Sequence, residues 1–74
     1  MTENIRVLIA QNLGIGEEEV TEAARLREDL GMDEIASVEL GMALEQLLDR
    51  EVSEEDMAEL DTVQDVMTLI QSVR

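Results

Sequence analysis

The sequence predicts an all-α fold, a bundle of four helices, and three observations support this prediction. Proline and aromatic residues are absent from all 74 positions, which disfavours a sheet protein with tight turns. Strong helix formers such as Met, Leu, Ala, Glu and Gln are abundant. Apolar residues recur at helical spacing in separate stretches. We expect a single domain over residues 1–74, close to the size at which one core is only marginally stable.

The first helix is expected from about Thr2 to Leu13 and is followed by a long connection. One apolar stripe runs along this helix, formed by Ile5, Leu8, Ile9 and Leu13. Gly14 and Gly16 should end it. The connection over residues 14–32 is longer than a structureless loop should be in a small domain. We therefore expect it to contain a short turn of helix and to be held on the core by its apolar residues, namely Ile15, Val20, Ala24 and Leu26.

The second helix is predicted to start at Asp33, a good N-cap residue, and to run to about Arg50. With a turn of about 100° per residue, its apolar residues fall into two sectors. The sector expected to face the core contains Leu40, Leu44, Leu47 and Leu48. The opposite sector contains Ile35, Val38 and Met42, with the carboxylates of Glu39, Glu45 and Asp49 around it.

This second apolar sector predicts a docking surface, because so small a bundle can cover only one face of a helix. An apolar stripe bordered by carboxylates suits a basic partner that has a hydrophobic pocket. The alternative is that Val38 or Met42 packs under the long connection, since single exposed apolar residues are common.

Capping patterns predict two more helices. Ser53, with Asp56 three residues later, forms an approximate capping box for a short third helix. Asp61 and Gln64 have the same spacing and predict a fourth helix that ends near Ser72. The inward stripe of this fourth helix is expected to consist of Val63, Val66, Met67 and Ile70.

Composition excludes several classes of function. The chain has 19 acidic residues, five arginines, no lysine and no histidine, and its net charge is −14. Such a charge should repel nucleic acid and anionic membranes and attract basic partners, unless it serves only solubility. Without cysteine or histidine there is no thiolate metal site, thiol nucleophile or usual general base. Nothing pairs a nucleophile with a base, so we do not expect an enzyme.

Two further features concern where the protein works. No apolar run approaches the roughly 18 residues of a membrane span. The first residues do not have the pattern of a signal peptide. We expect a cytoplasmic monomer that does not insert into membranes.

The segment Leu30-Gly31-Met32-Asp33-Glu34-Ile35 resembles the attachment segment of acyl carrier proteins, which reads leucine, glycine, any residue, aspartate, serine, leucine. In that family the serine carries a 4′-phosphopantetheine arm through a phosphodiester. The resemblance places Asp33 at the aspartate, Ile35 at the final leucine and Glu34 at the serine. Since a carboxylate has no hydroxyl to be phosphorylated, it implies that the arm cannot be attached at Glu34.

The resemblance covers most of the chain. Further similar segments are 11–15, 18–21, 28–31, 38–40, 42–45 and 62–65. It implies a four-helix bundle of acyl carrier protein type with a long loop between helices 1 and 2 and a short helix 3. It also implies that partners read helix 2 at Ile35, Val38, Glu39, Met42 and Glu45. Ala36 departs from the family, which often has an acidic residue there.

Three hypotheses about function remain, and we prefer the first. It is a relative of acyl carrier proteins that carries no cofactor and docks on basic-surfaced enzymes of fatty acid, polyketide or lipid metabolism. The docking residues would be Asp33, Glu34, Ile35, Val38, Glu39, Met42 and Glu45. In this reading Glu34 partly imitates a phosphodiester or is simply a favourable residue for the first turn of a helix.

The second hypothesis is a working carrier with 4′-phosphopantetheine at an unusual site. Ser37 has the hydroxyl nearest to Glu34 in the sequence. A helical wheel places Ser37 on the inward face of the second helix, where a transferase would reach it poorly. The third hypothesis is an acidic metal-binding or inhibitor module that uses residues 17–19 and 54–56. No calcium-loop spacing is present, so we expect no specific metal site.

Overall fold

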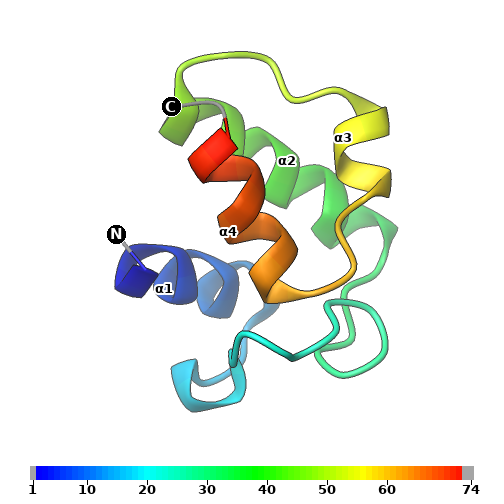
Figure 1. Ribbon diagram of the computed structural model, residues 1–74. Coiled ribbons are helices and arrows are strands. Elements are labelled where there is room, and N and C mark those ends of the chain that lie inside the picture. The colour runs from blue at the N-terminus through cyan, green and yellow to red at the C-terminus, as the bar shows by residue number, and fades with distance from the viewer. Residues whose placement is uncertain (1, 73–74) are drawn as a thin grey trace.

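Four helices and a short 3₁₀ turn make up the computed structural model, which describes residues 2–72 and the side chains from Ile5 to Ser72 (Figure 1). The elements are α1 (Thr2–Leu13), η1 (Glu17–Glu19), α2 (Glu34–Leu48), α3 (Glu54–Ala58) and α4 (Val63–Ser72). No strand occurs within residues 2–72, where an isolated bridge joins Arg25 and Thr62. The predicted all-α bundle of four helices is confirmed. None of the helices in this part of the chain has the length and apolar character that a membrane crossing requires.

The core lies between the helices and the long connection that follows α1. Its fully buried side chains are Ile9, Val20, Leu26, Leu40, Leu44, Val63 and Val66. The predicted stripe of α4 is confirmed, because Val63, Val66, Met67 and Ile70 are all buried. In α1, Ile5 and Ile9 are buried while Leu8 and Leu13 are half-buried. Burial of each aliphatic side chain stabilises the folded state by about 1.5–3 kcal/mol. The sum of these contributions stabilises the core of a chain that has no aromatic residues.

The connection after α1 is fixed at both ends of η1. Gly14 has a left-handed backbone (φ +68°), which lets the Ile15 N–H donate to the Ala10 carbonyl at 3.0 Å and ends α1. The Arg6 guanidinium on α1 then donates to the carbonyls of Val20 (3.0 Å) and Glu17 (2.8 Å). As predicted, the connection contains a short helical turn.

The later part of the connection pairs with the segment between α3 and α4. The Leu26 N–H donates to the Asp61 carbonyl at 2.8 Å, and the Val63 N–H donates to the Ala24 carbonyl at 3.0 Å. Val20, Ala24 and Leu26 are buried as predicted, whereas Ile15 is only half-buried. The long connection is therefore a structural part of the core.

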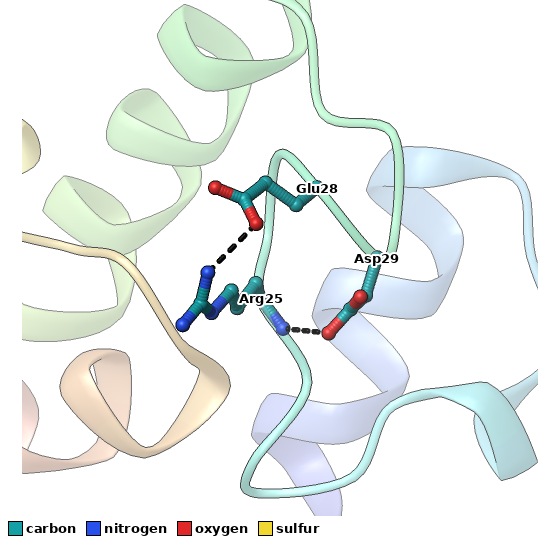
Figure 2. Close-up of polar contacts among 3 residues, drawn as sticks. All are labelled: Arg25, Glu28 and Asp29. Atoms are coloured by element: carbon teal, nitrogen blue, oxygen red, sulfur yellow. Dashed lines mark hydrogen bonds and ion pairs between the residues drawn. The ribbon is translucent and has the colours of Figure 1, made fainter.

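A tight turn follows this pairing (Figure 2). The Asp29 carboxylate accepts from the Arg25 N–H at 2.9 Å, and the Arg25 guanidinium donates to Glu28 at 2.7 Å. The hydrogen bond and the charge of Glu28 raise the pKa of Arg25. This is the one ion pair among the side chains described, and both partners are exposed, so it adds little stability.

Two helix ends differ from the sequence prediction. Helix α2 ends at Leu48 and not at Arg50, because Asp49 adopts a left-handed backbone (φ 54°, ψ 44°) and its N–H donates to the Glu45 carbonyl. Aspartate tolerates this conformation better than most residues.

The capping box of α3 is confirmed. Ser53 Oγ accepts from the Asp56 N–H at 3.1 Å, and the Asp56 carboxylate accepts from the Ser53 N–H at 3.3 Å.

The capping box of α4 lies one residue later than predicted. Thr62 and Asp65 form it instead of Asp61 and Gln64. Thr62 Oγ1 accepts from the Asp65 N–H at 3.2 Å, and the Asp65 carboxylate accepts from the N–H groups of Thr62 (3.0 Å) and Asp61 (2.9 Å). The cause is tertiary, since the backbone before Val63 is already paired with the connection at Ala24 and Leu26.

Asp65→Ala should destabilise the protein by about 1 kcal/mol, as loss of a helix cap usually does. The backbone N–H groups of Thr62 and Asp61 lower the pKa of Asp65. A lowered folded pKa adds stability above the unfolded value of about 3.9, and this stability is lost as pH falls through the folded value. In urea unfolding, the difference between Asp65→Ala and the unchanged protein should stay constant from about pH 7 to 5 and shrink below about pH 4. A difference that persists at about pH 3 would contradict a role for the ionised carboxylate.

The net charge of −14 should make the fold sensitive to ionic strength. Because like charges crowd a small surface, screening by salt should relieve repulsion. Sodium chloride or millimolar magnesium should therefore raise the melting temperature, by roughly 4–8 °C for each kcal/mol relieved. Mild acidification toward the pI of about 4.1 should act in the same direction, until the capping carboxylate of Asp65 protonates. Circular dichroism melts over a series of salt concentrations at one pH check this, and a melting temperature indifferent to salt would refute it.

Candidate functional site

The candidate site begins at the N-terminus of α2. Asp33 is the N-cap, as predicted, and its carboxylate accepts from the Ala36 N–H at 2.7 Å. Glu34 is the first residue of the helix and is exposed. A carboxylate at this place interacts favourably with the positive end of the helix dipole. Residue 34 is thus presented to solvent on a firmly capped first turn.

The second apolar sector of α2 is exposed, as the helical wheel predicted. The exposed fractions are 72% for Ile35, 60% for Val38 and 59% for Met42. On the other face, Leu40 and Leu44 are completely buried. The alternative that Val38 or Met42 packs under the long connection is wrong. We call Ile35, Val38 and Met42 the docking stripe, after the docking surface that the sequence predicts.

The inward sector of α2 is rotated relative to the prediction. Leu47 is 46% exposed although we expected it to face the core, and Gly41 is buried. Met57 of α3 lies against Gly41. A Cβ built on Gly41 would be 3.5 Å from the Met57 sulfur. Helix α3 therefore covers the side of α2 that contains Gly41.

The three carboxylates predicted around the stripe differ in their surroundings. Glu39 and Asp49 are exposed. Glu45 is half-buried, and its carboxylate accepts from the Val52 N–H at 3.0 Å. Glu45 thus fixes the turn between α2 and α3, in addition to lying beside Met42. Its side chain has a structural contact that the sequence did not indicate.

A hollow of about 430 Å³ lies between α2, α3 and the long connection, next to the docking stripe. Its apolar lining is Val38, Gly41, Met42, Val52, Met57 and Ala58, and its polar lining is Arg27, Glu34, Ser37, Glu45 and Glu54. A shallower hollow of about 450 Å³ adjoins it, lined by Met42, Glu45, Gln46, Asp49, Arg50 and Glu51.

Ser37 does not face fully inward, contrary to the prediction. It is half-buried and lines the deeper hollow together with Glu34. On the helical wheel Ser37 lies between Leu44 and Gly41, on the inward sector. It stays half-buried because the hollow between α2, α3 and the long connection opens beside it.

The sequence did not indicate either hollow, nor the arginine that lines each of them, Arg27 in the deeper one and Arg50 in the shallower one. Gly41 was the available signal, since a glycine inside a helix often marks a close approach of another segment. Across the described residues, no group of three or more Asp or Glu side chains is arranged to hold a metal ion.

The chain matches the family described as "Phosphopantetheine attachment site" over residues 3–70. It belongs to this family. Two solved structures are similar to this member along nearly their whole length. One, from Mycobacterium tuberculosis and described as an acyl carrier protein, is 30% identical with a TM-score of 0.86, and the match covers 96% of this chain and 95% of that one. The acyl carrier protein of Enterococcus faecalis is 26% identical with a TM-score of 0.81, and the match covers 99% and 92%. The resemblance to acyl carrier proteins is confirmed.

The chemistry available to this family member at the start of α2 differs from that of a phosphodiester site. An ester of phosphopantetheine needs a hydroxyl oxygen, and residue 34 supplies a carboxylate. The arm therefore does not fit residue 34. The hydroxyl nearest in sequence is that of Ser37, in the hollow.

Proposed function

We propose that this acyl-carrier-protein-like domain does not carry a phosphopantetheine arm and instead docks on basic-surfaced enzymes of fatty acid, polyketide or lipid metabolism. Docking would use Asp33 and Glu34 at the start of α2, the docking stripe, and the carboxylates of Glu39 and Glu45. The domain would act as a regulator, scaffold or complex subunit. It has no catalytic role in this proposal.

The exposure of the docking stripe is the observation that carries the proposal. Three large apolar side chains on one face of a 15-residue helix are each more than half exposed. Burying them in a partner's pocket would contribute about 25 cal/mol per Å² of apolar surface removed from water. The exposed carboxylate of Glu39 lies within the same stretch of α2 and would attract basic side chains around that pocket.

The position of Ser37 supports a second candidate, a carrier modified at that serine. Its hydroxyl lines an open hollow beside Glu34 and is not sealed in the core. We rank this candidate second because the serine is half-buried and lies one turn inside α2. Peptide mapping after incubation with coenzyme A and a transferase separates the two.

Docking can be measured on a Glu34→Ser background, with a broad-specificity phosphopantetheinyl transferase as the probe enzyme. The initial rate of labelling then reports how well α2 is recognised. Adding Met42→Ala should reduce the rate, and adding Glu39→Lys should slow association and change its salt dependence. Leu47→Ala is the matched control, because Leu47 is also a partly exposed apolar residue of α2 but lies off the stripe. Equal rates for all four proteins would refute docking through the stripe.

A further inference from the structure

We propose that the deeper hollow, between α2, α3 and the long connection, receives one arginine side chain of the docking partner. The proposal rests on the proposed function and names the partner group that enters the domain beside the docking stripe. An apolar side chain, which the exposed stripe alone would favour, is the occupant that it excludes.

The lining of the hollow has two parts of different chemistry. The apolar part consists of Val38, Gly41, Met42, Val52, Met57 and Ala58. The polar part has the three carboxylates of Glu34, Glu45 and Glu54, against the single guanidinium of Arg27. The hollow is therefore both apolar and net acidic.

The carboxylates of the hollow come from two helices. Glu34 is the first residue of α2, Glu54 is the first residue of α3, and both are exposed. Glu45 already accepts the Val52 N–H at 3.0 Å, so Glu34 and Glu54 are the more open acceptors. A planar guanidinium has five N–H donors that can bond carboxylates on two sides, whereas an ammonium group is a compact, strongly hydrated point charge. Acceptors on separate helices therefore favour arginine over lysine.

A side chain that enters the hollow also covers its carboxylates. An apolar side chain would remove water from them and offer no hydrogen bond in return, which costs free energy. Arginine has an aliphatic stem for the apolar lining and a charged head for the carboxylates. The volume of about 430 Å³ is sufficient, since pockets that bind whole small molecules begin at about 300 Å³.

Gly41 supports this assignment, because nothing in the fold of α2 requires a glycine there. Its backbone is helical and not left-handed. A Cβ at this position would be 3.5 Å from the Met57 sulfur, which is an ordinary van der Waals distance. Glycine inside a helix is also less stable than alanine. The missing side chain is explained if the space between Gly41 and Met57 stays open for an occupant.

Three helical peptides test the occupant directly. They have the same leucine stripe and the same flanking arginines, and they differ only at the centre of the stripe, which is arginine, citrulline or norleucine. Citrulline has nearly the shape of arginine without its charge. Titration calorimetry at about 0.15 M salt measures the dissociation constants. We expect the arginine peptide to bind about tenfold more tightly than either of the others, and tightest binding of the norleucine peptide would overturn the proposal.

Neutralising variants of the domain separate this contact from attraction to the net charge. Glu54→Gln should reduce the advantage of the arginine peptide over the citrulline peptide severalfold. Glu55→Gln is the matched control, because Glu55 is the next residue of α3, is also exposed and does not line the hollow. Both variants change the net charge equally. Equal reductions would mean that the net charge attracts the arginine, and the proposal would be wrong.

Gly41→Ala tests whether the arginine enters the hollow. The variant should keep or raise the melting temperature, because the added methyl group fits beside Met57 and alanine favours the helix. It should nevertheless weaken binding of the arginine peptide, because the methyl group narrows the hollow. Unchanged affinity in the folded variant would place the arginine outside the hollow and contradict the proposal.

Ile35→Ser distinguishes a failure of this inference from a failure of the docking proposal. Ile35 belongs to the docking stripe but does not line the hollow, so its replacement should weaken all three peptides. Binding that is absent or indifferent to Ile35→Ser would refute the docking surface itself. Binding that depends on Ile35 but is equal for the arginine and citrulline peptides would refute only the arginine in the hollow.

Discussion

Leu44→Ala should lower the free energy of unfolding by about 2–5 kcal/mol, whereas Met42→Ala should change it by less than about 1 kcal/mol. The two residues are neighbours on α2 with opposite surroundings. Leu44 is completely buried, so its truncation removes buried surface and leaves a cavity in the core. Met42 is 59% exposed, and its truncation removes little contact. Because the chain has no aromatic residue, urea unfolding should be followed by far-ultraviolet circular dichroism.

The small size of the domain limits how much stability a core substitution can remove before the protein unfolds. Domains have total stabilities of only about 5–15 kcal/mol, so Leu44→Ala can remove a large part of the folded population. Leu44→Met keeps most of the volume and should cost less than about 1.5 kcal/mol, which gives a folded reference at the same position. Equal losses for Met42→Ala and Leu44→Ala would mean that the stripe belongs to the core.

The sequence predicted the helices well because their signals are local. Asp33 and Ser53 accept the N–H groups expected of N-cap residues, and the stripe of α4 packs as its spacing indicated. The errors lie where tertiary contacts decide. Pairing between the connection and the residues before Val63 moved the cap of α4 to Thr62. No window of local sequence contains both partners of that pairing.

The candidate site was predictable only in part for the same reason. Opposite faces of α2 follow from helical geometry, so the exposure of Val38 and Met42 could be read from their spacing. The hollow beside them depends on where α3 packs. Arg27 comes from the long connection, whose path over α2 is set by tertiary contacts, and the Glu45 contact with Val52 depends on the path of the chain after α2.

Glu34→Ser should convert a protein that a transferase cannot label into one that it labels. Asp33 caps α2 and residue 34 is exposed, so a serine hydroxyl there would be presented on an ordered first turn. Glu34→Gln is the matched control, since it removes the charge without adding a hydroxyl and should remain unlabelled. Labelling is measured as the mass gain after incubation with coenzyme A and a broad-specificity phosphopantetheinyl transferase. Failure of Glu34→Ser to gain mass would contradict the assignment of residue 34 to the attachment position.

Whether the protein carries a phosphopantetheine arm is tested most directly by the intact mass of the unchanged protein after coexpression with the same transferase. The expected result is the mass of the unmodified chain, because residue 34 offers no hydroxyl and Ser37 is half-buried inside α2. Addition of one phosphopantetheine group, mapped to Ser37 by peptide analysis, would contradict the account and establish the protein as a carrier.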